Sequence, residues 1–400
     1  MKMSLVRPID RLQFFARCPA YFLAFSIPLS QFISSRFLLV AFVLVILIHR
    51  QFTHRLVRKT IDVLIYFFVA IIGLLYSANL EEGLRSLETG ACFLAIPLVF
   101  NLIHPFTTRE LRKILAFFTF GVTFSCLICI VNAFVSYSGN ASFSYFFFHE
   151  FTNIIDFQPT YFAYYLVFSI TFALYSLSYD EDFLNSRVVI FSTLFFLFVL
   201  MLSGGKTSFM SLLLVFSFFI LRFFLDGNKK INAPTISLII AMMICMFFVT
   251  FYESGSRTLI LNDSWDRYDL WKSAIFANEN VLFGVGTGDY KVVLNEYLIS
   301  HSMEKYAFDS MNSHNQFIQS YLSNGLLGLL AIIFLLGRPL YLSFIRGYTF
   351  GILVFFPFLL YGMTEVFLGR YQGVVFFAFL HQAFISYLDS SKPTIDLKRT

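Results

Sequence analysis

Long apolar runs constrain the fold of this chain more than any other feature of its sequence. Three of them are "VLIYFFVAIIGLLY" (63–76), "VVIFSTLFFLFVLML" (188–202) and "ISLIIAMMICMFFVTF" (236–251), which approach the roughly 20 residues that a helix needs to cross a bilayer. Apolar residues are contiguous in these runs and do not alternate with polar ones, so the runs predict membrane helices rather than barrel strands. The chain is 58% hydrophobic and 13% charged, unlike an ordinary soluble domain. We therefore expect an all-α, polytopic integral membrane protein.

Apolar runs of this kind recur along the whole chain, so residues 1–400 are predicted to form a single transmembrane domain. The longest segment between two runs is 252–314, which we expect to be a large loop on the outer side. The runs predict about twelve transmembrane helices, at residues of roughly 18–33, 36–48, 61–76, 90–104, 113–136, 159–178, 188–202, 207–225, 233–251, 315–336, 349–364 and 371–388.

The positions of Lys and Arg predict how these helices are oriented. Basic residues cluster before the first helix, in "HRQFTHRLVRK" (49–59), "RELRK" (109–113) and "DGNKK" (226–230), and at the carboxyl end in "DLKR" (396–399). All these segments fall on one side when the helices alternate, and the positive-inside rule makes that side cytoplasmic. Both termini are therefore predicted to be cytoplasmic. The net charge of +5 is spread over short connections instead of one basic face, so nucleic-acid binding is not expected.

Three short motifs superficially resemble ligand sites. "LSGGKTS" (202–208) ends like a phosphate-binding loop but lacks its earlier glycine, which leaves Lys206 as either a site residue or an interfacial lysine. "FGVGTGDY" (283–290) lacks the strand–turn–helix context of a dinucleotide site and is expected to be a flexible outer turn, whose backbone N–H groups could approach a phosphate. "SYDED" (178–182) is expected to be a solvated cytoplasmic turn.

A group of polar residues is predicted to meet at the outer rim of the helices. His314 stands immediately before an apolar run, where it is either a neighbour of a helix cap or a functional residue. Arg267 lies in the amphipathic segment "DRYDLWKSAIF" (266–276), and Lys206 and the pair Glu365/Arg370 are predicted at the same level. Few ionisable residues fall near the predicted centres of the helices, where a transporter would need them. Cations at the rim suit an anionic lipid headgroup.

Four segments in this order resemble the O-antigen ligase/O-antigen polymerase superfamily of bacterial envelope polysaccharide glycosyltransferases. They are "RYDLW" (267–271), "FGVGTGDY" (283–290), "NSHNQFIQSYLSNGLLGLL" (312–330) and "TEVFLGRYQGVVFFAFL" (364–380). The resemblance implies an enzyme of the bacterial inner membrane that transfers a glycan from undecaprenyl diphosphate, with its active site and the loop 252–314 facing the periplasm. It also implies functional roles for Arg267 and His314, and it aligns Lys206 with a family arginine.

The chemistry implied by this resemblance assigns a role to each candidate residue. The diphosphate leaving group is a stable anion that Arg267 and Lys206 would bind, and His314 would accept the proton of the acceptor hydroxyl. Glu365 and Arg370 are expected to form a structural pair, and direct participation in catalysis is the alternative. No metal-ligand spacing surrounds His314, so we expect neither a metal nor another cofactor. Residues expected to bind glycan hydroxyls or orient the base are Asn312, Asn315, Gln316, Gln158 and Tyr161.

Three functions remain open at this level. A ligase would transfer the glycan to a lipid A-core acceptor, whereas a polymerase would use the same lipid-linked donor with another glycan as acceptor. A flippase or other transporter of lipid-linked glycans is the third. Sequence favours the ligase, because the loop before the tenth predicted helix is the part most similar to that family.

Overall fold

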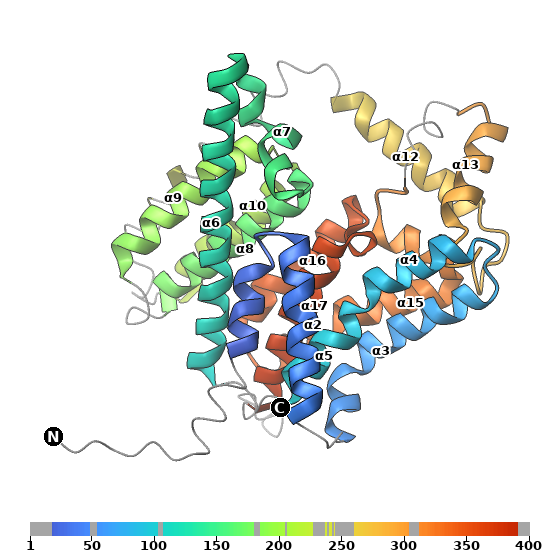
Figure 1. Cartoon of the computed structure of the whole chain (residues 1–400), viewed down its shortest axis with the longest axis horizontal. Helices are drawn as coiled ribbons and strands as arrows, with labels where there is room; N and C mark the ends of the chain where they lie inside the picture. Colours follow the sequence, from blue (N-terminus) through green and yellow to red (C-terminus); the bar gives the residue numbers. More distant parts are fainter. Residues whose placement is uncertain are drawn as a thin grey trace.

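The computed structural model describes residues 18–48, 54–102, 107–179, 185–204, 206–226, 260–303 and 312–390, with isolated positions between 237 and 244. Every regular element in these ranges is an α-helix or a short 3-10 helix, which confirms the all-α prediction (Figure 1). Several expectations fall outside the described residues: both termini, the acidic residues 180–182, most of the ninth predicted helix (233–251), and residues 252–259 and 304–311 of the long loop.

Most of the predicted membrane helices are present, each as a separate helix of the structure. Five helical segments of the described chain are long and apolar enough to cross a membrane, namely Leu80–Phe100, Thr108–Asn140, Pro159–Ser178, Ser186–Ser203 and Gln316–Ile345. The number twelve and the sidedness of the chain stay predictions. The helices that match predicted ones are α2 (Gln31–Ile48), α3 (His54–Leu75), α5 (Cys92–Leu102), α6 (Thr108–Asn140), α8 (Pro159–Tyr179), α9 (Ser186–Ser203), α10 (Lys206–Asp226), α15 (Gln316–Ile345), α16 (Thr349–Thr364) and α17 (Tyr371–Ser390).

The boundary between the first two predicted helices differs from the prediction. A helix runs from residue 18 to 26, a turn follows, and α2 begins at Gln31 instead of residue 36. Pro28 lies in this turn, and proline has no N–H with which to continue a helix. The Ser30 hydroxyl then accepts the Phe32 N–H at 3.2 Å, which satisfies one of the free donors at the start of α2.

Aromatic packing holds α8, α16 and α17 together at the centre of the molecule. The rings of Tyr164 on α8 and Tyr361 on α16 stack at 4.6 Å, and Phe376 on α17 lies 4.5 Å from the ring of Tyr165. These side chains are buried, so each contributes both apolar area and ring contacts to the core. The packing fixes the adjacent ends of α8, α16 and α17, near which candidate site residues lie.

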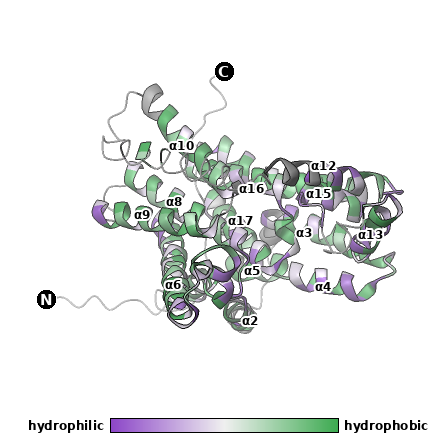
Figure 2. Cartoon of the chain, turned by 90° about the horizontal axis from the view of Figure 1, so that it is seen from above, coloured by the Kyte–Doolittle hydropathy of each residue, from purple (hydrophilic) through white to green (hydrophobic). Residues whose placement is uncertain are grey.

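Three helices outside this core are amphipathic or polar: α4 (Leu80–Gly90), α12 (Ile260–Phe276) and α13 (Tyr290–Ser300). Hydrophilic colour is concentrated on them, at the end of the molecule that also contains α3 and part of α15 (Figure 2). The helices predicted within 77–90 and 266–276 are therefore present. Leu80 and Leu84 of α4 are exposed, as expected for a helix whose apolar side faces lipid.

The glycine-rich turn 283–288 is packed against α15, which corrects the expectation of a flexible turn. α15 is interrupted at Asn324 and Gly325, and the N–H groups of Val285 and Gly286 donate to α15 carbonyls there at 3.0 and 2.9 Å. Gly284 has φ +75°, and a Cβ at this position would lie 2.5 Å from the Gly325 nitrogen. The glycines therefore permit close contact between two backbone segments, and the N–H groups that a phosphate would need are occupied.

A buried ionic cluster joins α3, α15 and α17, although the sequence suggested almost no ionisable residues inside the helices. Asp62 accepts hydrogen bonds from Arg338 at 2.7 Å and from His381 at 2.6 Å. The side chains of Asp62 and His381 are fully buried. Charges buried in this way require partners, and here each side chain lies against another of the cluster. The cluster therefore ties together three helices that contact one another.

Candidate functional site

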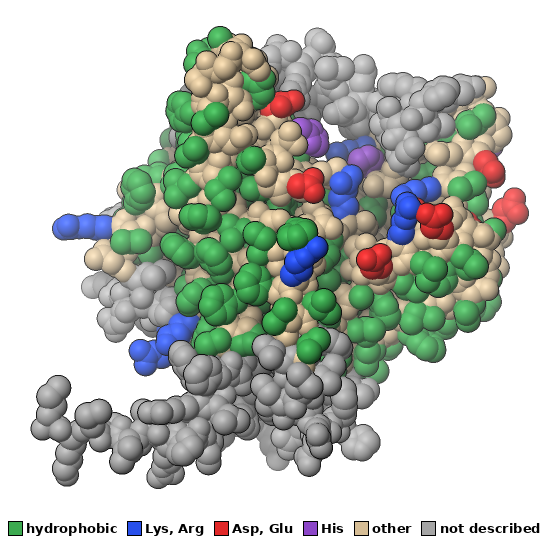
Figure 3. Space-filling view, in the orientation of Figure 1, with side chains coloured by type: hydrophobic (Ala, Val, Ile, Leu, Met, Phe, Trp, Pro, Cys, Tyr) green, Lys and Arg blue, Asp and Glu red, His purple; other side chains and the backbone are tan. Residues whose placement is uncertain are grey.

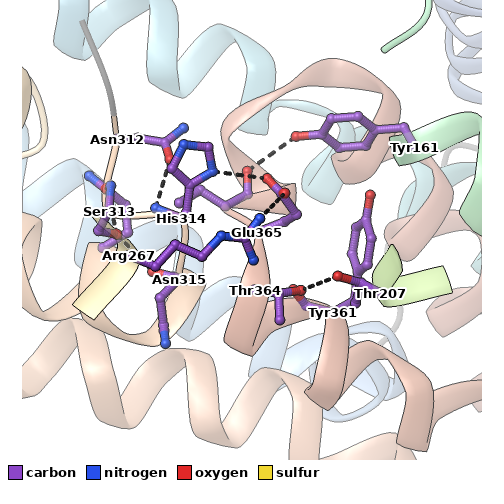
Figure 4. Close-up of polar contacts among 12 residues, drawn as sticks. Tyr161, Thr207, Arg267, Asn312, Ser313, His314, Asn315, Tyr361, Thr364 and Glu365 are labelled. Carbon is purple, nitrogen blue, oxygen red and sulfur yellow. Dashed lines mark hydrogen bonds and ion pairs between the residues drawn. The ribbon is translucent and has the colours of Figure 1, made fainter. Parts of the chain in front are cut away.

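Three ionisable side chains from separate parts of the chain meet at the ends of the helices. Glu365 follows α16, and its Oε1 lies 3.8 Å from Nη2 of Arg267 on α12. Its Oε2 lies 3.4 Å from Nδ1 of His314, which precedes α15 (Figure 4). The side chains are partly exposed, at 38% for Arg267, 31% for His314 and 19% for Glu365. A ligand can therefore reach all three, and the carboxylate lies between two basic groups.

Glu365 is positioned by the end of α16 and the turn that follows it. Its backbone is extended (φ −145°, ψ 151°), and its N–H donates to the Tyr361 carbonyl at 2.9 Å. Two side chains then fix the turn: Tyr161 donates its hydroxyl proton to the Val366 carbonyl at 3.2 Å, and Gln316 accepts the Leu368 N–H at 2.8 Å. Tyr161 and Gln316, expected to contact glycan or orient the base, are buried and brace the segment that presents Glu365.

His314 has a left-handed backbone conformation, with φ +45°. For a residue with a Cβ this conformation costs on the order of 1–2 kcal/mol. Asn312 compensates by accepting the His314 N–H on its side-chain oxygen at 2.8 Å. Asn315 caps α15 by accepting the Phe317 N–H at 2.9 Å and donates to the Met363 carbonyl at 3.2 Å. The strained residue is thereby held between the start of α15 and the end of α16.

Ser313 and Gln319 pair with each other next to His314; the sequence showed both in the polar cluster before the apolar run but assigned neither a role in the site. The Ser313 hydroxyl and N–H both donate to Gln319 Oε1, at 3.0 and 3.2 Å, and both residues are buried. The sequence shows that polar side chains cluster before and within the first turn of α15. It does not show which of them pair, because the pairing depends on the left-handed turn at His314.

Lys206 is the first residue of α10, and the described structure does not include its side chain. The next residue, Thr207, shares a hydrogen bond of 2.9 Å with Thr364, which immediately precedes Glu365 (Figure 4). The start of α10 therefore lies beside the end of α16. This brings the Lys206 backbone into the neighbourhood of the Arg267, His314 and Glu365 cluster.

Glu365 and Arg370 do not form the expected pair. They are only five residues apart in the sequence, but the backbone is extended at both, and only the short 3-10 helix η3 (Phe367–Gly369) lies between them. Arg370 instead lines a polar cavity of about 550 Å³ together with Gln158. Gln158 and Arg370 are thus close to each other, and neither contacts His314.

The described residues contain no group of three or more His, Cys, Asp or Glu side chains arranged to hold a metal ion. Within the described chain, the carboxylate of Glu365 is the one acidic group paired with His314, and the same carboxylate pairs with the cation Arg267. A guanidinium at this distance disfavours a second positive charge. The expectation of metal-independent chemistry stays a prediction.

The helices and the accessible polar cluster support a multi-pass membrane protein whose site lies at the ends of its helices. Residues 191–333 match the sequence model of a family described as O-antigen ligase (Wzy_C). This match confirms the resemblance to the O-antigen ligase/O-antigen polymerase superfamily. The matched segment includes α10, α12 and His314, whereas Glu365, Arg370 and Tyr161 lie outside it.

One curated protein with similarity to this chain comes from Haemophilus influenzae (strain ATCC 51907 / DSM 11121 / KW20 / Rd) and is described as an uncharacterized protein. It is 26% identical over 141 residues, which cover 32% of this chain and 34% of the relative. The chain thus spans about a third of the length of the curated relative it matches.

Proposed function

We propose that this protein is an O-antigen-ligase-type glycosyltransferase of the bacterial inner membrane. It would transfer a glycan from undecaprenyl diphosphate to a lipid A-core acceptor on the periplasmic side, with both of its own termini in the cytoplasm. The main support is the meeting of Arg267 and His314 at Glu365. A cation for the leaving group and a base with its own carboxylate partner are the two elements that such a transfer needs.

In the proposed reaction the acceptor hydroxyl oxygen attacks the anomeric carbon of the donor sugar. The bond from that carbon to the diphosphate oxygen breaks, and the diphosphate leaves with the bonding electrons. The hydroxyl proton passes to Nε2 of His314, because Nδ1 faces Glu365. Glu365 accepts a hydrogen bond from the protonated Nδ1 and stabilises the imidazolium that forms.

Arg267 is proposed to bind the diphosphate. Its guanidinium has five N–H donors, and the contact to Glu365 at 3.8 Å leaves most of them for a ligand. Lys206 would supply a second positive charge from the start of α10. Lysine binds phosphate as a point charge, without the planar fork of arginine, so its contribution depends on charge more than on geometry.

An O-antigen polymerase is the nearest alternative, since it would use the same donor and the same base. A flippase or transporter would need ionisable groups along a path through the helices. The buried groups Arg338 and His381 both pair with Asp62 instead. This pairing favours a structural role for the three residues over a place on a transport path.

The enzymatic proposal is tested with purified protein, lipid-linked donor and lipid A-core in a metal-free buffer. His314→Ala should reduce transfer by at least about 100-fold, the usual minimum for losing a general base. Glu365→Gln should reduce the turnover number more than it raises the KM for donor, because Glu365 stabilises the protonated His314 and is not assigned to bind the donor. His301→Ala is the matched control, since His301 is an exposed histidine at the end of α13 that lies on Tyr297. Near-normal transfer by folded His314→Ala protein would remove His314 from the mechanism.

Ligase and polymerase are distinguished by the glycolipids of a deletion strain. Loss of a ligase should leave bare lipid A-core while polymer accumulates on undecaprenyl diphosphate. Loss of a polymerase should leave core bearing a single repeat, because a separate ligase still acts. We expect the first pattern, and core capped with one repeat would replace the ligase proposal by the polymerase.

A further inference from the structure

Two adjoining hollows lie between α2, α4, α5, the start of α17 and the segment 149–158, which includes most of α7 (Phe148–Thr152). One is the polar cavity of about 550 Å³ that contains Arg370, and the other is a groove of about 1020 Å³ lined mainly by apolar side chains. Gln31, Thr89 and Tyr371 line both, so the two hollows share a wall. A polar and an apolar compartment side by side fit a ligand that has both a polar head and an apolar tail.

The polar cavity has the side chains that bind sugars. The carboxylates of Glu150 and Asp156 accept hydrogen bonds from hydroxyl groups, and the amide of Gln158 can both accept and donate. Gln372 is held in place by donating to the Asp156 carbonyl at 3.2 Å. Arg370 lies in the same cavity and has no ion-pair partner among the described residues. This composition suits a polyhydroxylated headgroup with an anionic substituent.

The groove combines an apolar floor with two arginines. Leu38 and Leu39 from α2 and Leu94 from α5 supply aliphatic surface, and Leu39 is 61% exposed. Arg36 and Arg85 also line this groove. Arg36 is exposed and donates to the Phe32 carbonyl at 3.2 Å, and Arg85 is 68% exposed where it pairs with Glu81. Among the described residues, Glu88 is the one carboxylate in the lining of the groove. Arginines beside an apolar surface suit the phosphates of an anionic lipid.

The hollows lie next to the Arg267, His314 and Glu365 cluster but on different elements. Glu365 belongs to the cluster and Arg370 lines the polar cavity, so the turn 365–370 has the cluster at its start and the cavity at its end. The described residues that line the hollows include none from α10 or α12. Figure 3 shows charged and histidine side chains gathered around a hollow above a broad hydrophobic surface.

We propose that the groove and the cavity form the acceptor site. The acyl chains of an anionic glycolipid lie in the groove, its phosphates bind Arg36 and Arg85, and its sugars enter the cavity beside the turn 365–370. The inference rests on the proposed function, because the donor diphosphate is assigned to Arg267 and Lys206 on α12 and α10. The two lipids then reach the same turn from different helices, so neither has to leave before the other arrives.

The test uses lipid A-core in nanodiscs as the acceptor and lipid-linked glycan as the donor. Leu39→Trp should obstruct the groove and raise the KM for acceptor about tenfold, while the KM for donor changes by less than about twofold. Val131→Trp on α6 is the matched control, because Val131 is also 61% exposed but lies outside both hollows. Arg370→Ala should raise the same KM for acceptor.

A second measurement does not depend on turnover. With p-benzoylphenylalanine in place of Leu39, illumination should crosslink the protein to lipid A-core, and excess lipid A-core should compete whereas undecaprenyl diphosphate should not. Competition by undecaprenyl diphosphate would assign the groove to the donor and overturn the proposal. An unchanged KM for acceptor together with no crosslink would overturn the proposal and indicate that the groove contacts only bulk lipid. If the wild-type protein transfers nothing, the proposed function fails, and the crosslink still decides whether the glycolipid binds here.

Discussion

Replacing Asp62 by asparagine removes the carboxylate that Arg338 and His381 share. The substitution preserves the shape of the side chain, so it creates no cavity. It leaves a guanidinium that is only 16% exposed beside a neutral amide, and a fully buried imidazole without its anionic acceptor. Nδ1 of His381 already has no hydrogen-bond partner, so the ring depends on its contact with Asp62. We therefore expect a loss of stability without a change in the composition of the site.

The size of this loss follows from the burial of the cluster. Removing one partner of a buried ion pair costs about 3–5 kcal/mol, because the other charge stays desolvated. A chain of 400 residues with about 2.1 cal/mol/K of unfolding entropy per residue has a total of about 0.84 kcal/mol/K. The melting temperature should then fall by about 5 °C. Membrane helices keep part of their structure on unfolding, so the entropy is smaller and the shift at least this large.

Thermal unfolding in nanodiscs, followed by intrinsic fluorescence, measures the shift. Glu81→Gln is the control, because the Glu81–Arg85 pair is exposed and should contribute less than about 0.5 kcal/mol. The combined variant Asp62→Leu, Arg338→Met and His381→Phe should recover most of the loss, since it leaves no buried charge unpaired. A melting temperature for Asp62→Asn within 1 °C of wild type, on the order of the control effect, would refute a role of the cluster in holding α3, α15 and α17 together.

Three further outcomes are expected. Lys206→Arg should keep the KM for donor near the wild-type value, whereas Lys206→Ala should raise it about tenfold or more. Equal activity of the two variants would make Lys206 an interfacial lysine. Transfer should continue in excess chelator, and a loss restored by one defined metal would contradict the proposed site. Gly284→Ala should lower the melting temperature more than Gly139→Ala, because a Cβ would meet α15 at the first position and open space at the second.

The sequence determined the helices because lipid leaves the backbone few alternatives. Apolar runs approaching 20 residues must satisfy their N–H and C=O groups internally, and a helix does so within one segment. Local signals also placed the ends of several elements, as at α16, whose observed bounds of Thr349–Thr364 equal the predicted 349–364. Arg267 and His314 were predicted as site residues from short motifs that resemble a known family, and each motif lies within or directly beside one helix.

Only the tertiary structure decided the partners of these residues. Glu365 reaches His314 across 51 positions, and Asp62 reaches His381 across 319, so no local pattern contains either contact. The pairing of Glu365 with Arg370 failed as a prediction because it assumed a compact turn, whereas extended backbone at both residues directs the side chains to different neighbours. The glycines at 284 and 286 predicted a flexible turn from the local sequence, but the backbone there packs closely against the kink of α15. Side-chain chemistry is local, but the distances between side chains are set by how the helices pack.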